Sequence, residues 1–244
     1  MRTFVDIHCH ALFGVDDGAR NESVMEKMLR MAYCDGTRVM CLTPHHDVKG
    51  TASLEQIKEV FAEAEAFCRD NLPDMRVYLG NELTYRFGCA ESLIQGSCKT
   101  LAESRYVLVD FFSAPDAPAV IRGVESLQNA GFLPIVAHVE RYGCFSGNKR
   151  ELIKLSQTGA VLQINAASLL QGWFSSIGRT ARWLLAKGMA HVVASDGHDD
   201  EVRVPVLGKA YDFVKKRFGE AYAEQLFCVH PMKILEGKRI DKNW

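Results

Sequence analysis

The chain has 244 residues, of which 48% are hydrophobic and 24% are charged, and its formal net charge is −1 at pH 7. This length allows a large hydrophobic core, and the composition is typical of a soluble globular protein. The balanced charge argues against a nucleic-acid partner, because proteins that bind nucleic acids usually carry a strongly basic surface.

The N-terminal sequence MRTFVDIH contains no apolar segment of the kind found in signal peptides. No apolar run approaches the roughly 20 residues that a membrane span needs. The eight cysteines are scattered and form no C-x-x-C pair. This pattern favours reduced thiols over a disulfide framework or a thiolate zinc site. We therefore expect a cytoplasmic protein without membrane insertion.

Short apolar strands and amphipathic helices alternate along the chain. The first strand is expected around Phe4, Val5 and Ile7, and a helix follows over Glu22–Asp35, with Asn21 as its N-cap and Gly36 as its end. Further strands are expected over 38–42, 75–79, 105–109, 132–137, 160–164 and 191–194. Further helices are expected over 54–69, 119–130, 152–157, 180–187, 206–218 and 221–227, and a last short turn over 231–235.

About seven strand–helix units in succession predict a parallel sheet with crossover helices. Their regularity favours an α/β fold in which the sheet closes into a (β/α)7 barrel. No linker, repeat or low-complexity segment divides the sequence. We therefore expect residues 1–244 to form one domain.

Polar side chains follow nearly every predicted strand. In a (β/α) barrel the carboxyl ends of the strands meet at one face, which is where active sites lie. Asp16 and Asp17 come shortly after the first strand and can add oxygen ligands. The residues at the strand ends are His8, His10, His45, Glu82, Asp110, His138, Asp196 and His198.

Five histidines and several carboxylates exceed what one tetrahedral zinc ion needs. They favour a cluster of two or three divalent metal ions, and imidazole with carboxylate ligands suits manganese, iron or zinc. Such clusters promote hydrolysis, with phosphate esters as natural substrates. Arg141 and Arg203 lie close in sequence to His138 and His198. A guanidinium group matches the oxygens of phosphate, so these two arginines are candidate catalytic residues; solvated loop arginines are the alternative.

Six motifs occur in order: D-I-H-C-H with V-D-D-G, T-P-H-H, G-N-E, V-L-V-D-F, A-H-V-E-R-Y and A-S-D-G-H. Together they resemble the PHP (polymerase and histidinol phosphatase) superfamily. More closely, they resemble its bacterial protein-tyrosine phosphatases, which are encoded with capsule and exopolysaccharide genes. The D-D-G segment, A-H-V-E-R-Y and Q-I-N-A-A-S-L narrow the resemblance, which extends from Asp6 to about Leu235.

This resemblance implies a distorted seven-stranded TIM-like barrel with a trinuclear, usually manganese-dependent site. A hydroxide bound to the metal would attack the phosphorus atom of phosphotyrosine directly, and no phosphoenzyme intermediate would form. The implied substrate is the tail of a tyrosine autokinase that controls polysaccharide export, and Arg141 and Arg203 would hold the phosphate. The implied metal ligands are His8, His10, Asp17, His45, Glu82, Asp110, His138, Asp196 and His198.

One position departs from the family pattern, because Asp110 stands where the family has Glu. The shorter side chain can weaken a bridging ligand. A non-catalytic scaffold of the kinase therefore stays open as one alternative. A histidinol phosphatase or other small-molecule phosphomonoesterase of the superfamily is another, because the sequence alone does not show the substrate. His46, His191 and His230 match no motif and are expected to be polar loop residues.

A cysteine-dependent mechanism is a weaker alternative. Cys144 and Arg150 have the C-x5-R spacing of the cysteine phosphatases, in which a thiolate attacks phosphorus. Matches to so short a motif often arise by chance, and no histidine stands immediately before Cys144. We therefore favour the metal site.

Overall fold

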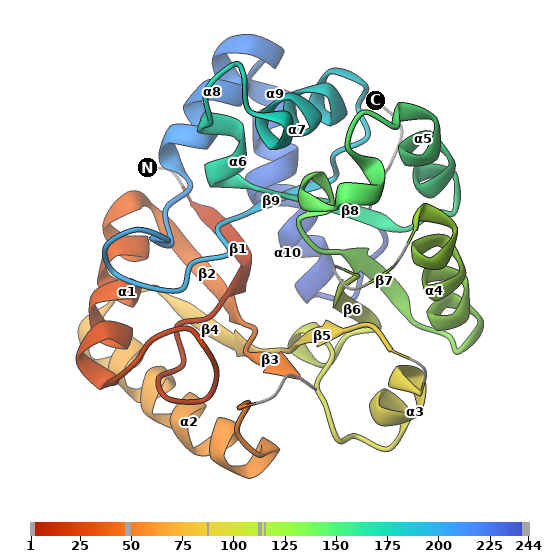
Figure 1. Cartoon of the computed structure of the whole chain (residues 1–244). Helices are drawn as coiled ribbons and strands as arrows, with labels where there is room; N and C mark the ends of the chain where they lie inside the picture. The colour runs from red at the N-terminus through yellow and green to blue at the C-terminus, as the bar shows by residue number, and fades with distance from the viewer. Residues whose placement is uncertain (1–2, 47–49, 87, 112–113, 115, 241–244) are drawn as a thin grey trace.

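A computed structural model describes residues 3–46, 50–86, 88–111, 114 and 116–240. Parallel strands gather in the middle of the molecule, and most of the helices lie around them (Figure 1). The strands are β1 (Phe4–Cys9), β2 (Thr37–Leu42), β3 (His45–His46), β4 (Arg76–Leu79), β5 (Glu82–Thr84), β6 (Tyr106–Asp110), β7 (Leu133–Val136), β8 (Val161–Asn165) and β9 (Val192–Ala194).

The strands form two hydrogen-bonded sheets in the orders β1-β2-β4 and β3-β5-β6-β7-β8-β9, and all pairs are parallel. The sheets are continuous along the chain, since β3 follows β2 after Pro44 and β5 follows β4 after Gly80 and Asn81. Backbone hydrogen bonds from Gly80 to Leu42 (2.9 Å) and from Glu82 to Pro44 (3.1 Å) span the break. Because β2 with β3 and β4 with β5 each occupy one place in the sheet, the nine strands correspond to seven strands of a barrel.

The ring of strands closes between β1 and the residues after β9. Cys9 and Gly197 form a parallel bridge, and the amide of Asp196 donates to the carbonyl of His8 at 2.9 Å. The amide of His10 donates to the carbonyl of Gly197 at 2.8 Å. The predicted (β/α)7 barrel is thus confirmed in a distorted form.

Particular residues cause the interruptions between β2 and β3 and between β4 and β5. Pro44 has no amide hydrogen to contribute to a ladder. At Gly80 a Cβ atom would lie only 2.6 Å from the Leu101 side chain, so a larger residue does not fit. These residues end β2 and β4 and start new short strands at His45 and Glu82, the two positions whose side chains enter the site.

The predicted helices are present with shifts of a few residues at their ends. Asn21 caps the first helix by accepting from the amide of Val24, and Gly36 ends it at a φ of 112°. The helices are α1 (Glu22–Asp35), α2 (Leu54–Asn71), α3 (Cys89–Ile94), α4 (Ala117–Asn129), α5 (Lys149–Gln157), α6 (Ala166–Leu170), α7 (Ser176–Ala186), α8 (Gly208–Phe218), α9 (Glu220–Glu224) and α10 (His230–Leu235).

Two helices, α3 and α6, were not predicted, because neither is long enough to establish a helical hydrophobic period. The helix expected over 221–227 is α9 followed by a π-helical segment, Gln225–Val229, that continues into α10. Ile234 and Leu235 of α10 share a buried cluster with strand residues such as Ile7 and Ile135. Among the described residues, no helix has both the length and the apolar character needed to cross a bilayer.

Candidate metal centre at the barrel mouth

The structure brings together all nine residues that the family resemblance implies as metal ligands. Four lie in the strands β1, β3, β5 and β6, and the others lie in the segments that follow β1, β7 and β9. Seven of them line a cleft of about 170 Å³ together with Arg141 and Arg203. His8 and His10, both fully buried, complete the set. The cleft is lined by Asp17, His45, Glu82, Asp110, His138, Arg141, Asp196, His198 and Arg203.

These side chains form three overlapping groups, in each of which the potential ligand atoms lie within 4.8 Å of one another. His10 belongs to two of the groups and Glu82 also belongs to two, so each can serve neighbouring ions. The groups are His8–His10–Glu82, His10–Asp17–His45–His198 and Glu82–Asp110–His138. Asp196 belongs to none of them, but its Oδ1 atom lies 3.4 Å from Nε2 of His8 and 3.5 Å from Nδ1 of His198.

The arrangement of the donor atoms fits metal ions. The Nε2 atoms of His8 and His10 face each other at 3.2 Å, and Oε2 of Glu82 lies 3.4 Å from the first and 3.3 Å from the second. Among the described residues, Nδ1 of His138 is buried and has no hydrogen-bond partner. Buried imidazole nitrogens and carboxylate oxygens that converge at such distances are suited to a divalent cation, and this donor set suits manganese, iron or zinc.

Buried polar residues behind the candidate ligands hold them in place. The side-chain oxygen of Gln163 accepts from the amide of His138 at 2.9 Å and lies 3.1 Å from Nδ1 of His8. Its amide nitrogen donates to Asn165, which in turn donates to Oδ2 of Asp196 at 2.7 Å. Such outer partners fix the tautomer and orientation of ligating histidines.

Asp16 has a similar supporting role. One of its carboxylate oxygens lies 2.7 Å from Nδ1 of His10 and accepts from the backbone amide of His45 at 2.9 Å. Asp17 instead lies at the mouth, where its Oδ1 is 3.3 Å from Nε2 of His45. The two neighbouring aspartates therefore differ, since the first orients a histidine and the second faces the cleft.

Backbone conformation also aims two of the candidate ligands. His138 has a φ of 31° and Asp196 a φ of 53°, both in the left-handed region that non-glycine residues rarely adopt. Each lies two residues after the end of its strand, β7 or β9. Strain at such positions is common in functional sites, because the surrounding structure must hold it in place.

Two arginines meet on one carboxylate at the rim. Nη1 of Arg141 and Nη2 of Arg203 lie 3.0 and 2.9 Å from the same oxygen of Asp196. Their side chains are 36% and 40% exposed, which leaves part of each guanidinium group facing the cleft. Two cations fixed side by side at the entrance can bind a dianionic group.

The charges of the metal-free site are strongly coupled. Burial lowers the pKa of His10, but hydrogen bonds to Asp16 and Glu82 outweigh burial and raise it to about 10. Burial and the nearby charge of His10 lower the pKa of His198 to about 3. Burial raises the pKa of Glu82, but the charge of His8 and hydrogen bonds from histidines bring it well below its usual range. In the metal-free site at neutral pH, His10 is therefore protonated and His198 is neutral, and their stacked rings lie 3.9 Å apart at the centroids.

The C-x5-R segment has a different environment. Cys144 is half-buried in a 3₁₀ turn, and burial raises the pKa of its thiol. A nucleophilic cysteine needs a lowered pKa. Arg150 lies on the exposed surface of α5. This environment disfavours the cysteine mechanism.

The expectation that His191 and His230 are polar loop residues is wrong. Both are buried: the ring of His191 accepts from the amide of Leu162, and the ring of His230 donates to the carbonyl of His191. Each stabilises the barrel instead. Their motif-free positions gave no signal of this, because a buried hydrogen bond between distant segments leaves no local pattern. His46 lies in β3 beside His45.

Comparisons with known proteins agree with this geometry. The profile of the family described as capsular polysaccharide synthesis, CpsB/CapC, matches residues 4–236. The tyrosine-protein phosphatase CpsB from Streptococcus pneumoniae is 30% identical over 238 residues, 95% of this chain and 98% of that protein. The tyrosine-protein phosphatase YwqE from Bacillus subtilis is 28% identical over 218 residues, 88% of this chain and 85% of that protein.

Solved structures show the same relationship. A structure reported with YwqE from B. subtilis and CpsB from S. pneumoniae, described as unique metal-dependent tyrosine phosphatases, matches with a TM-score of 0.89 at 25% identity. The match covers 97% of this chain and 96% of the other. The family resemblance predicted from the six motifs is therefore confirmed over nearly the whole chain.

Proposed function

The chain belongs to the capsular polysaccharide synthesis family CpsB/CapC, and we propose that it is a metal-dependent protein-tyrosine phosphatase. One observation carries this proposal: three overlapping groups of metal-binding atoms lie in the same cleft as two arginines fixed on one carboxylate. The first feature suits the activation of water, and the second suits the recognition of a phosphoryl group.

The metal ligands in this proposal are His8, His10, Asp17, His45, Glu82, Asp110, His138, Asp196 and His198. They would hold two or three divalent ions, with manganese first and iron or zinc as alternatives that the same donors accept. When bound, such ions activate water as a nucleophile and withdraw charge from phosphoryl oxygens. Asp110 reaches the same group as Glu82 and His138. This supports its role as a ligand despite its shorter side chain.

The protein's own side chains orient the substrate. Arg141 and Arg203 would each donate to oxygens of the phosphoryl group through nitrogens that Asp196 does not use. Because Asp196 holds both guanidinium groups, the two forks are already in place before substrate arrives. Asn165 restrains the same carboxylate oxygen of Asp196, so it positions both arginines indirectly.

The remaining parts of the proposal concern the biological setting. We propose that the phosphotyrosyl substrate is the tail of a tyrosine autokinase that regulates capsule or exopolysaccharide synthesis, in the cytoplasm. The family description supports the capsule setting. The closed ring of strands supports one domain over residues 1–244.

Substrate choice tests the proposal. Purified protein supplied with manganese would be assayed for phosphate release from a phosphotyrosyl peptide, the matching phosphoseryl peptide and histidinol phosphate. Preference for the phosphotyrosyl peptide supports the proposed function. Turnover of histidinol phosphate alone would assign the protein to the small-molecule branch of the superfamily. Inactivity towards all three, with metal bound, would support a scaffold.

A further inference from the structure

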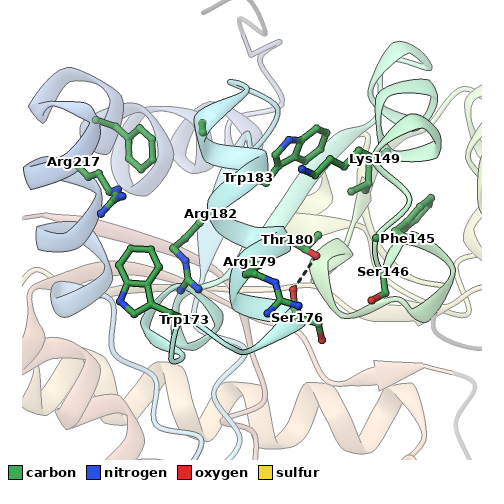
Figure 2. A pocket seen from close by; sticks show the side chains of 14 residues that line it. Phe145, Ser146, Lys149, Trp173, Ser176, Arg179, Thr180, Arg182, Trp183 and Arg217 are labelled. Atoms are coloured by element: carbon green, nitrogen blue, oxygen red, sulfur yellow. Dashed lines mark hydrogen bonds between the residues drawn. The ribbon is translucent and has the colours of Figure 1, made fainter.

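A second cavity lies outside the metal centre, on the outer surface of α7. It is a groove of about 620 Å³ between α7, the N-terminal end of α5 and the C-terminal end of α8. Figure 2 shows its side chains, which come from α7 in the centre, from residues 145–149 on one side and from α8 on the other. We name it the basic groove and define it by Lys149, Arg179, Arg182, Arg217, Trp173 and Trp183.

The basic groove carries four cationic side chains, and none of the described residues that line it has a carboxylate. Three of these cations instead lie over aromatic rings. Arg182 and Arg217 lie 5.0 and 5.2 Å from the ring centre of Trp173, and Lys149 lies 5.5 Å from that of Trp183. Burial and the charges of Arg217 and Arg179 lower the pKa of Arg182. Like charges gathered without counter-charges favour an anionic occupant.

The rim of the basic groove is unusually apolar for exposed surface. Phe174 is 96% exposed and Trp173 is 65% exposed, and Leu170 at the end of α6 is about half exposed. This segment is held firmly, since Arg182 donates to the carbonyls of Leu169 and Gln171, and Arg179 donates to that of Phe174. Aromatic side chains fixed beside arginines are typical of surfaces that bind proteins.

The basic groove lies close to the catalytic cleft. The ring of His138 contacts that of Tyr142 at 5.9 Å, and Tyr142 stacks on Phe145, a lining residue of the groove, at 6.2 Å. The rings of His138 and Phe145 are therefore no more than about 12 Å apart, which corresponds to about four residues of extended chain. The helix α7 also packs against the turn Val139–Arg141, which carries one of the phosphate-binding arginines. A polypeptide with its phosphotyrosine in the cleft can therefore reach the groove.

We propose that the basic groove binds an acidic segment of the phosphotyrosyl protein substrate, a few residues away from the phosphotyrosine. The proposal rests on the phosphatase activity inferred above and adds a second contact to it. An open groove with separated cations suits an extended acidic peptide better than a compact ion. Exposed ion pairs are individually weak, so several together give a preference of about three- to tenfold.

The test compares two phosphotyrosyl peptides. One carries a run of Asp and Glu beginning about four residues from the phosphotyrosine, on either side, and the other carries Asn and Gln instead. Wild-type protein is expected to favour the acidic peptide about three- to tenfold in kcat/KM, mainly through KM. Equal kcat/KM for the two peptides would overturn the proposal.

Charge reversal locates the effect. Lys149→Glu with Arg217→Glu changes two exposed side chains of the basic groove and should abolish the preference while leaving turnover of p-nitrophenyl phosphate unchanged. The matched control is Lys187→Glu with Lys216→Glu, which changes the net charge equally at exposed positions of the same region outside the groove. Loss of the preference in the control as well would contradict the proposal, because it would show a diffuse charge effect.

A binding experiment separates this proposal from the phosphatase assignment. Fluorescence anisotropy of the unphosphorylated acidic peptide should show binding to wild type and about three- to tenfold weaker binding to the doubly reversed variant. This result in a protein that hydrolyses no phosphotyrosine would refute the phosphatase function but retain the acidic docking site. Equal affinity of wild type and variant would refute the docking site whatever the activity.

Discussion

The metal centre and the basic groove differ in what surrounds their charged side chains. In the metal centre imidazoles and carboxylates lie side by side, most of them buried, and buried amides such as those of Gln163 and Asn165 restrain them. In the basic groove three of the cations lie over tryptophan rings at the surface, without carboxylates among the described lining residues. The first arrangement is rigid and suits chemistry. The second leaves its cations accessible at the surface and suits recognition.

The difference follows from where the side chains originate. Strand ends supply the metal centre, and the barrel fixes their separation. Helix surfaces and one loop supply the basic groove, so its side chains lie at the surface of the protein. Substitutions should therefore have large effects in the first region and small ones in the second, in the order of the predictions below.

The largest effect is expected from His138→Ala. This change removes a ligand atom from the group shared with Glu82 and Asp110 and leaves the buried Glu82 without its 2.8 Å contact. Because even outer partners of ligands are worth 10–100-fold, phosphate release should fall by more than about 100-fold. His46→Ala, in the same strand as His45 but outside the three groups, is the control and should retain activity. Equal loss in both variants would mean that the effect is general.

Gln163→Met tests whether the buried amide supports the metal centre. The substitution keeps the side-chain length but removes the acceptor for His138 and the contact with His8. Metal affinity, measured as the manganese concentration needed for half-maximal activity, should fall about 10- to 100-fold. Gln128→Met makes the same chemical change far from the cleft, where Gln128 donates to the carbonyl of Thr158. An unchanged manganese requirement in Gln163→Met would show that the ligands are oriented without it.

Metal affinity should rise with pH. The pKa of His10 is raised to about 10, so its imidazole is protonated at neutral pH in the metal-free protein and must lose that proton to ligate. His198, with a pKa of about 3, is already neutral and contributes no proton. For each proton released when metal binds, the metal affinity should rise about tenfold per pH unit. Calorimetric titration in buffers of different ionisation enthalpy counts the protons, and zero release would contradict this account.

The smallest effect is expected from Asp110→Glu. The longer carboxylate matches the family pattern, and Asp110 already reaches the group that contains Glu82 and His138. We therefore expect a few-fold gain in manganese affinity, because the change improves an existing contact. A gain of several orders of magnitude would mean instead that Asp110 does not ligate in the native protein.

Much of the fold could be predicted because it depends on local patterns. Asn21 and Gly36 mark the ends of α1 in the sequence as they do in the structure. The interruptions at Pro44 and Gly80 were not predicted as new strands, since two- and three-residue strands have no period of their own. Their identity depends on pairing between β3 and β5, which is a tertiary feature.

The site, like the fold, could be predicted from the sequence only in part. The candidate ligands could be found because strand ends converge in any barrel, whatever its details. The supporting role of Gln163 and Asn165 was missed, although two polar residues at alternate positions of a buried strand, β8, were a usable signal. The basic groove had no sequence signal, because Trp173, Lys149 and Arg217 come from three separate segments that only the packing of α5, α7 and α8 brings together.

Metal titration of the stripped protein tests the central claim most directly. Protein freed of metal with a chelator would be titrated with Mn²⁺ while phosphate release from a phosphotyrosyl peptide is followed. We predict that activity is absent after chelation and returns in proportion to the two or three ions bound. Full activity in the metal-free protein would contradict the account, since the three groups of ligands in the cleft would then have no part in catalysis.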